Sequence, residues 1–269
     1  MIIFPEQPNI KLEVIGQASS KPKLALFAPH ENENVANNYV TQQIIERGGV
    51  FVILRQDGKR LLRFDIAPFE VEIDPNRMFT KQGRRKNIIK HNPKLRTNTY
   101  VFHRAMRRSA ALATLIISTM GGTDPSRTWL AIHNNTQGYL GDNKQGIGNI
   151  SILQYQQKLA DGAAFIMAVS KQHGDEDDLF FVTKQQDFNT LQQNGWNAVL
   201  QHPQVITNPT EDDGSLSVYA QKLGIRYINI EAERSTNNIG ENHLVKQQQM
   251  LNFVLNNLLN NNIKNDLND

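Results

Sequence analysis

Four short apolar runs in this chain each end in polar residues, and this arrangement constrains the fold more than any other feature. The four polar clusters are His30 with Glu33, Asn76 with Arg77, His133, and Glu231 with Glu233. The segments between the runs alternate between strand-like and helix-like patterns, which is typical of an α/β protein. Open α/β sheets place ligands outside the carboxyl ends of their strands. If the four runs share one sheet with their ends on one edge, the polar clusters converge.

The apolar runs and turn signals predict an α/β fold, a single-domain mixed β-sheet flanked by helices. Strands are expected at 11–15, 23–27, 50–54, 60–66, 69–73, 129–132, 164–169, 179–183 and 225–232, and helices at 34–47, 99–120, 154–159, 215–223 and 241–259. The pair Asp57-Gly58 predicts a hairpin between the strands at 50–54 and 60–66. Residues 1–260 are expected to form one domain, with loops at 134–148 and 185–213, and 261–269 a polar tail.

Composition excludes several classes of protein. The chain has 269 residues, of which 39% are hydrophobic and 20% charged, as in a soluble globular protein with a full core. No run approaches the roughly 20 apolar residues of a membrane span. Residues 1–4 are too short for a signal-peptide core, and Pro5 follows them. Many Asn and Gln residues and the lack of cysteine favour a bacterial periplasmic or secreted protein, with a cytoplasmic one as the alternative.

The absence of cysteine also limits the chemistry. It excludes disulfides, thiolate metal ligands and a cysteine nucleophile. Any metal must therefore be held by histidine and carboxylate side chains.

The segment 81–108 contains ten Lys or Arg residues and no acid. Such a run can face nucleic acid or another polyanion. Here it has few aromatic residues to stack on bases and no nucleic-acid-binding motif, so we expect no nucleic-acid partner. A solvated face is the ordinary role of a charged run. Because the run directly follows Arg77, it can also make a neighbouring cleft attractive to an acidic substrate.

His30 and Glu33 lie three residues apart at a predicted strand-to-helix junction. Zinc binds such a pair when one more protein ligand and an open position for water are supplied. The spacing alone is common, and acids in the first turn of a helix are also favoured by the helix dipole. His133 and Arg77 likewise have structural alternatives, as a histidine bonded to backbone and a salt-bridge partner. The other histidines show no paired spacing: His91, His103, His173, His202 and His243.

In sequence order, these motifs resemble the zinc carboxypeptidases of the M14 type and their deacylase relatives, such as aspartoacylase and succinylglutamate desuccinylase. The family order is His-x-x-Glu, Asp-x-Asn-Arg-x-Phe, a strand-end His and a strand-end Glu. In this chain the four motifs lie at residues 30–33, 74–79, 130–133 and 227–231. The family also has a characteristic sequence before its catalytic glutamate, and residues 214–219 and 224–227 resemble it. The resemblance extends from about Leu24 to the end of the last helix. It implies a zinc carboxypeptidase-like fold.

The resemblance implies that His30, Glu33 and His133 bind one zinc ion per chain and leave a position for water. Zinc would lower the pKa of that water from about 16 toward about 7 and polarise the scissile carbonyl. Glu231 would be the general base. Glu233 is the alternative, because side chains alternate along a strand and both therefore lie on one face.

The resemblance also implies a substrate-binding pair, Asn76 and Arg77, in which the planar guanidinium would bind a terminal carboxylate. The family has a further arginine that stabilises the oxyanion, and Arg60 and Arg63 are both candidates. The mobile tyrosine of the digestive carboxypeptidases has no match in this chain.

These roles predict a zinc-dependent hydrolase that cleaves an amide bond next to a free carboxylate, with a peptide or a peptidoglycan stem peptide as substrate. A second hypothesis is a deacylase of N-acyl amino acids on the same fold. A third is a non-catalytic protein that keeps the zinc site, because the second arginine is ambiguous and the tyrosine is missing. The sequence does not predict the oligomeric state.

Overall fold

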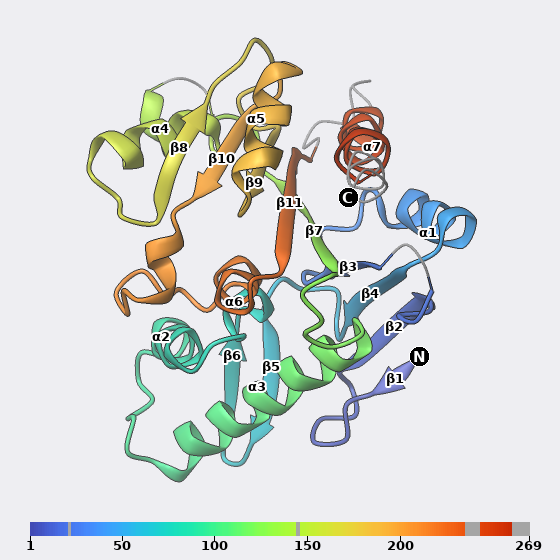
Figure 1. Ribbon diagram of the computed structural model, residues 1–269. Helices are drawn as coiled ribbons and strands as arrows, with labels where there is room; N and C mark the ends of the chain where they lie inside the picture. Colours follow the sequence, from blue (N-terminus) through green and yellow to red (C-terminus); the bar gives the residue numbers. More distant parts are fainter. Residues whose placement is uncertain (21–22, 144–145, 235–242, 260–269) are drawn as a thin grey trace. The chain divides into compact units, whose positions relative to one another are not determined.

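The computed structural model describes residues 1–20, 23–143, 146–234 and 243–259 (Figure 1). Its strands are β1 Ile2–Ile3, β2 Lys11–Gly16, β3 Leu24–Ala28, β4 Val50–Arg55, β5 Leu62–Ile66, β6 Phe69–Ile73, β7 Thr128–Asn135, β8 Ile166–Ser170, β9 Leu179–Val182, β10 Ala198–Gln201 and β11 Arg226–Glu233. Its α-helices are α1 Asn37–Arg47, α2 Lys81–His91, α3 Tyr100–Thr119, α4 Ile152–Ala160, α5 Gln185–Gln193, α6 Leu216–Leu223 and α7 His243–Phe253. Short helical turns are η1 Pro75–Arg77, η2 Leu140–Asp142, η3 Pro203–Ile206 and the π-helical η4 Val254–Leu258. The predicted tail 261–269 lies outside the described residues.

The strands form a nine-stranded mixed sheet, with the order β1-β2-β4-β3-β7-β11-β9-β10-β8, and a separate β5-β6 hairpin. The predicted mixed α/β architecture is therefore confirmed. The chain divides into two compact units. The first consists of Met1–Asn34, Val40–Ile132 and Pro203–Tyr227. The second consists of Val35–Tyr39, His133–His202 and Ile228–Asp269. Strands β7 and β11 each contribute residues to both units. That residues 1–260 act as one domain stays a prediction.

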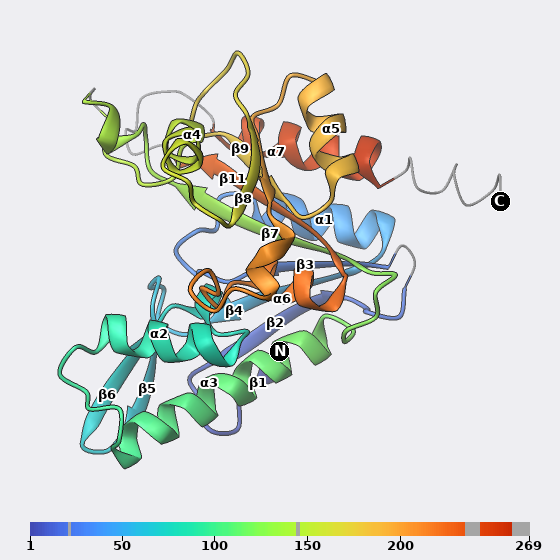
Figure 2. The same cartoon turned by 60° about the vertical axis from the view of Figure 1, so that its left-hand side comes forward.

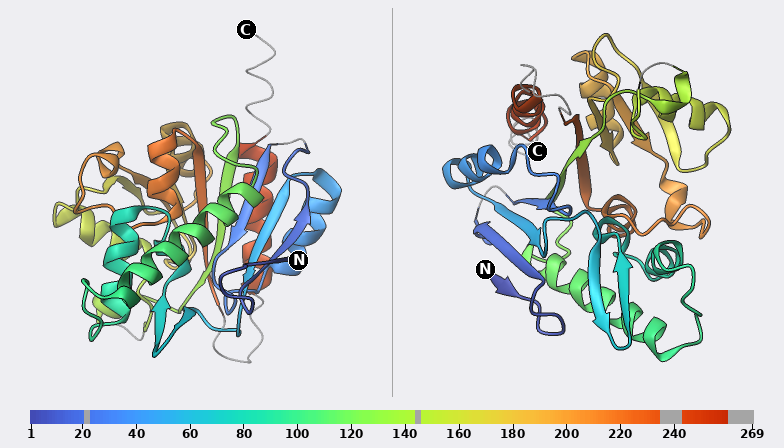
Figure 3. Two further views of the ribbon diagram at one scale, coloured as in Figure 1. Left: turned by 90° about the horizontal axis from the view of Figure 1, so that it is seen from below. Right: turned by 180° about the vertical axis from the view of Figure 1, so that it is seen from behind.

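In the first unit, β3 is the central strand. It pairs in parallel with β4, Ala25 opposite Val50, and with β7, Leu24 opposite Thr128. All five residues of β3 are buried, as expected for a strand with parallel neighbours on both sides. Helix α3 packs on the face that carries Ala25 and Phe27, and α1 covers the opposite face (Figure 3).

The hairpin β5-β6 packs against α2 and α3 in the same unit, and Figure 2 shows the three elements side by side. Helix α3 begins at the N-cap Thr99, whose hydroxyl accepts a hydrogen bond from the Phe102 N–H, at 3.2 Å. It ends before Gly121, which has a φ of 92° and allows the chain to turn away. These elements frame the segment 74–77, which carries the predicted Asn-Arg pair.

In the second unit, β9 pairs antiparallel with β11 and parallel with β10, and β10 pairs antiparallel with β8. Helices α4 and α5 lie on opposite sides of these strands (Figure 1). On the α4 side, Ile152 packs with Phe181 and Val199. On the other side, the Trp196 ring lies 5.5 Å from the Phe180 ring, centroid to centroid.

The predicted hairpin at Asp57-Gly58 is wrong. Gly58 does turn the chain, with a φ of 76°, but β4 pairs with β2 and β3, whereas β5 pairs with β6. The turn therefore connects two different sheets. The actual hairpin, between Ile66 and Phe69, turns through Ala67-Pro68.

Two further differences concern polar segments. The run 185–213, expected to be a loop, contains α5, β10 and η3, and the first part of the basic run forms α2. Both helices are rich in Gln, Asn or Lys and carry few apolar residues. Their sequences therefore show little of the apolar spacing by which a surface helix is recognised.

Candidate active site

The pair His30 and Glu33 lies directly beyond the end of β3. Both residues are almost fully buried, His30 with 1% and Glu33 with 4% of its surface exposed. The His30 Nδ1 atom lies 3.0 Å from the Glu33 carboxylate, and the Glu33 N–H donates to the His30 carbonyl at 3.1 Å. The turn between them therefore directs an imidazole nitrogen and a carboxylate oxygen toward one another. This is the convergence that the His-x-x-Glu spacing predicts.

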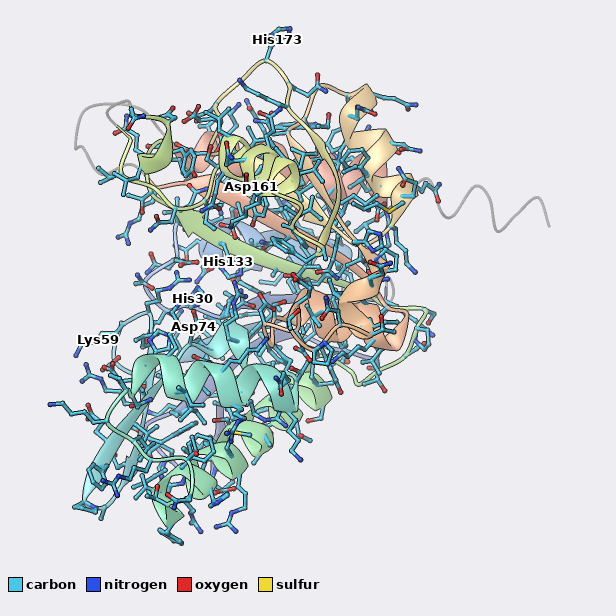
Figure 4. The ribbon with its side chains drawn as sticks, turned by 90° about the vertical axis from the view of Figure 1, so that its left-hand side faces the viewer. His30, Lys59, Asp74, His133, Asp161 and His173 are labelled. Carbon is cyan, nitrogen blue, oxygen red and sulfur yellow. The ribbon has the colours of Figure 1, made fainter. Side chains whose placement is uncertain are left out.

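Asp74 holds the other side of the His30 ring. Its Oδ1 atom lies 2.9 Å from His30 Nε2, and Figure 4 shows the two side chains next to one another. Asp74 is itself fixed, because its side chain accepts from the Asn76 N–H at 2.9 Å and its backbone bonds to the Asn87 amide. A histidine that binds a metal through one nitrogen commonly donates its other N–H to a carboxylate, which orients the ring. The sequence motif contains Asp74 but does not reveal this role.

The charges around His30 shift the pKa values of both His30 and Asp74. Burial alone would lower the pKa of His30, but the charges and hydrogen bonds of Glu33 and Asp74 raise it above its ordinary value. Burial alone would raise the pKa of Asp74, but the hydrogen bond and charge of His30, with the charges of Arg77 and Arg60, hold it well below its usual range. Asp74 is therefore an anion throughout the neutral pH range, as an orienting carboxylate must be.

If His30 is a zinc ligand, Asp74→Asn is expected to weaken zinc binding by about 10- to 100-fold, because an amide fixes and polarises the imidazole less well than a carboxylate. Titration with a competing zinc chelator measures the change. Asp65→Asn is the control, since Asp65 also accepts a side-chain hydrogen bond, from Gln7, but does not contact His30. Equal zinc affinity in Asp74→Asn and the unmodified protein would show that Asp74 does not support a metal ligand.

His133 lies in β7, two residues beyond Ala131, which is paired with Phe27 of the parallel strand β3. His133 is buried, with 3% of its surface exposed. His30 and Glu33 belong to the first unit and His133 to the second, and the three are the residues that the family motifs predict as metal ligands. Two imidazoles and one carboxylate form a donor set that suits zinc.

The two candidates for the oxyanion arginine lie in different surroundings. Arg60 pairs with the Glu33 carboxylate, and its Nη2 atom lies 3.7 Å from Asp74 Oδ2. Arg63 instead pairs with two glutamates of the β6 strand, with its Nε atom 3.4 Å from Glu70 and 3.3 Å from Glu72. The structure therefore brings Arg60, and not Arg63, to the predicted metal ligands.

Asn76 and Arg77 lie in η1, where the Asp74 cap connects them directly to His30. Arg77 faces Asp213, with Nε and Oδ2 3.4 Å apart. The residue after Asp213, Gly214, is packed so closely that an added Cβ would lie 2.4 Å from the Arg77 carbonyl oxygen. The position of Arg77 thus depends on close backbone packing from a distant part of the sequence.

A cavity of about 450 Å³ lies at Arg77 in the first unit. Arg60, Asp74 and Asp213 line it, together with Lys86 and Lys90 from α2. Part of the basic run therefore faces the same cavity as the predicted carboxylate-binding arginine. Other residues of that run, including Lys81, Arg85 and Arg107, line a second cavity of about 860 Å³ in this unit.

The two candidate bases on β11 differ in environment. Glu231 is half-buried, and its Oε1 atom accepts a hydrogen bond from the Asn229 amide at 2.9 Å. Glu233 is buried with 6% of its surface exposed, and one of its carboxylate oxygens lies within 4.8 Å of ligand atoms of both Asp175 and Asp177. Glu233 therefore belongs to a cluster of acids, whereas Glu231 is more exposed and bonds to Asn229.

Comparisons with known proteins give matches among solved structures alone, since no family model and no curated protein sequence matches the chain. Similar structures include succinylglutamate desuccinylase from Chromobacterium violaceum, with 14% identity, a TM-score of 0.43 and 87% of this chain covered. They also include the tripeptide-bound cell shape determinant Csd4 from Helicobacter pylori, with 11% identity, a TM-score of 0.42 and 92% covered. The chain spans 63% of the first protein's length and 55% of the second's.

Among the helices in the described part of the chain, none has the length and apolarity that a membrane span requires.

Proposed function

We propose that this protein is a zinc-dependent hydrolase that cleaves an amide bond next to a free carboxylate. The observation that carries the proposal is the buried His30 imidazole, which faces Glu33 at Nδ1 and Asp74 at Nε2. A metal-binding imidazole commonly donates its second N–H to a carboxylate that orients the ring, and Asp74 is placed for that role while Glu33 lies on the ligand side. With His133 as the third ligand, the donor set suits one zinc ion per chain.

Zinc, when bound, supplies a Lewis acid that polarises the scissile carbonyl and makes a water acidic enough to attack near neutral pH. Asp74 keeps His30 oriented with Nδ1 toward the ligand position. Glu231 accepts the proton of the attacking water and passes it to the leaving nitrogen. Arg60 stabilises the negative charge that develops on the carbonyl oxygen, a role supported by its contacts with Glu33 and Asp74.

Arg77 binds the substrate carboxylate, with Asn76 beside it. Its guanidinium offers parallel N–H donors that match a carboxylate, and Asp213 holds it at the cavity in the absence of substrate. Lys86 and Lys90 line the same cavity and increase its positive charge. The cavity therefore suits an acidic substrate, and the surplus of cations favours one with a second acidic group.

The surplus of cationic side chains in the cavity supports a second candidate function, a deacylase of N-acyl amino acids. The first candidate is a carboxypeptidase acting on peptides or peptidoglycan stem peptides. The two differ in what lies on the acyl side of the scissile bond. Parallel assays on peptides with free C-termini and on N-acyl amino acids, including N-succinyl compounds, separate them. The third possibility, a zinc-binding protein without catalysis, predicts no turnover on either set.

The carboxylate-binding role is tested by Arg77→Lys. We expect kcat/KM for a substrate with a free carboxylate to fall by about 10- to 100-fold, because lysine cannot form the bidentate pair. The same substrate with its carboxylate amidated is expected to be poor for both proteins and to differ little between them. Arg63→Lys is the matched control, since Arg63 pairs with Glu70 and Glu72 instead. Equal losses on the free and amidated substrates would contradict carboxylate binding by Arg77.

A further inference from the structure

Three acids in the second unit come together where β9 begins and β11 ends. Asp175 and Asp177 lie in the segment 171–178 that connects β8 to β9, and Glu233 is the last residue of β11. One carboxylate oxygen from each lies within 4.8 Å of the others. Asp177 and Glu233 are buried, and Asp175 is exposed. We call these residues the acidic cluster.

One buried carboxylate oxygen of the acidic cluster is available to a cation. Asp177 is 1% exposed, and its Oδ2 atom accepts a hydrogen bond from the Gly138 N–H. Its Oδ1 atom is buried and has no hydrogen-bond partner among the described residues. Burying a charged acceptor without a hydrogen bond costs free energy, so such atoms are rare unless an ion or a water molecule binds them.

Asn135, at the end of β7, supplies a second oxygen of this kind. Its side-chain nitrogen donates to the Asp177 backbone carbonyl at 2.6 Å, and its backbone carbonyl accepts from the Arg234 N–H at 2.9 Å. Asn135 thus bridges the loop that carries Asp177 and the end of β11, which carries Glu233. Its Oδ1 atom is buried and likewise has no hydrogen-bond partner among the described residues. The Asn135 side chain is thus held against the Asp177 backbone, and its oxygen can serve as a further donor.

No lysine or arginine in the described part of the chain forms a salt bridge with Asp175 or Asp177. The nearby Lys246 pairs instead with Asp178, at 4.0 Å. As a result, burial and the charges of Asp175, Glu233 and Glu176 raise the pKa of Asp177 to about 7, although the Gly138 N–H lowers it. The charges nearest to Asp177 are thus predominantly negative.

We propose that Asp175, Asp177 and Glu233 bind a calcium ion, with the Asn135 side-chain oxygen as a further donor. Calcium takes six to eight oxygen ligands, including waters, and accepts carboxylate and amide oxygens in irregular arrangements. An all-oxygen donor set differs from the two imidazoles and one carboxylate of the proposed zinc site, so the two ions are distinguished by ligand type. The exposed side of the cluster, at Asp175, leaves room for coordinating waters.

The ion would connect three segments of the second unit. Asp177 attaches the loop before β9 to Gly138, in the segment after β7, and Glu233 ends β11. Bound calcium would therefore connect the segment after β7 to the C-terminal end of β11. It also gives Glu233 a role other than that of general base.

The test uses the full chain, loaded with zinc, in buffer freed of calcium. Calorimetric titration with calcium chloride is expected to show about one site per chain. Thermal unfolding is expected to shift upward by about 5–10 °C at a calcium concentration about 100-fold above the Kd. In Asp177→Asn, which keeps an acceptor for Gly138, the calcium response is expected to disappear.

Two further variants keep the test decisive. Glu176→Gln removes the same charge from the same loop but lies outside the cluster, and is expected to retain the calcium response. Asp175→Asn changes an exposed ligand and is expected to weaken calcium binding at least about 10-fold even if Asp177→Asn folds poorly. Absence of a calcium response in the unmodified protein, or an unchanged response in Asp175→Asn and Asp177→Asn, would overturn the proposal. Neither outcome bears on zinc-dependent hydrolysis.

Discussion

Glu231→Gln is expected to lower kcat by about 10²- to 10⁴-fold while the zinc content stays at one ion per chain. The glutamine side chain has nearly the same shape and can keep the contact with Asn229, but it cannot accept a proton from the attacking water. The loss should therefore appear in the chemical step and not in metal binding. Steady-state kinetics and metal analysis on one preparation check both parts of this expectation.

Glu233→Gln is the matched comparison, because it makes the same change two residues away on the same face of β11. Its loss of kcat is expected to be much smaller, since Glu233 lies among Asp175 and Asp177. A larger loss in Glu233→Gln than in Glu231→Gln would reverse the assignment of the general base. Equal melting temperatures of the two variants, measured without calcium, would show that the comparison is not one of folding.

His133→Ala and His30→Ala are expected to reduce bound zinc from about one ion per chain to a small fraction and to lower hydrolysis to background. Each replacement removes one of the three proposed protein ligands, and the remaining His and Glu are expected to hold zinc only weakly. Elemental analysis of dialysed protein measures the zinc. His173→Ala is the control, because His173 is exposed and lies outside the proposed ligand set. Full zinc content in His30→Ala would remove His30 from the metal site.

The parts of the fold that the sequence predicts well are those with strong local signals. Strand β3 is a continuous apolar run, and α3 has an N-cap at Thr99 and glycines after its end, so their bounds agree with expectation to within a residue or two. The Asp57-Gly58 hairpin fails because a turn signal specifies a change of direction and not the partner of each strand. That partner is set by tertiary contacts, here between β4 and its neighbours β2 and β3.

The same distinction applies to the site. The facing of His30 and Glu33 follows from a spacing of three residues within one turn, which the sequence contains. The bond between His30 and Asp74 joins residues 44 positions apart, and no local pattern specifies it. Arg60 could not be separated from Arg63 by pattern, because the difference depends on which acids fold back toward each one.

The sequence pattern also cannot distinguish Glu231 from Glu233. Alternation along a strand places both on one face, so the sequence alone leaves them equivalent. What separates them in the structure is the acidic cluster, formed with residues more than 50 positions away in the sequence.

The requirement of hydrolysis for a bound zinc ion is tested by removing and restoring the metal in the unmodified protein. After treatment with a chelator and its removal, hydrolysis of the best substrate should be lost, and about one equivalent of zinc per chain should restore it. Calcium added alone should not restore it. Full activity in the metal-free protein would show that hydrolysis does not depend on zinc.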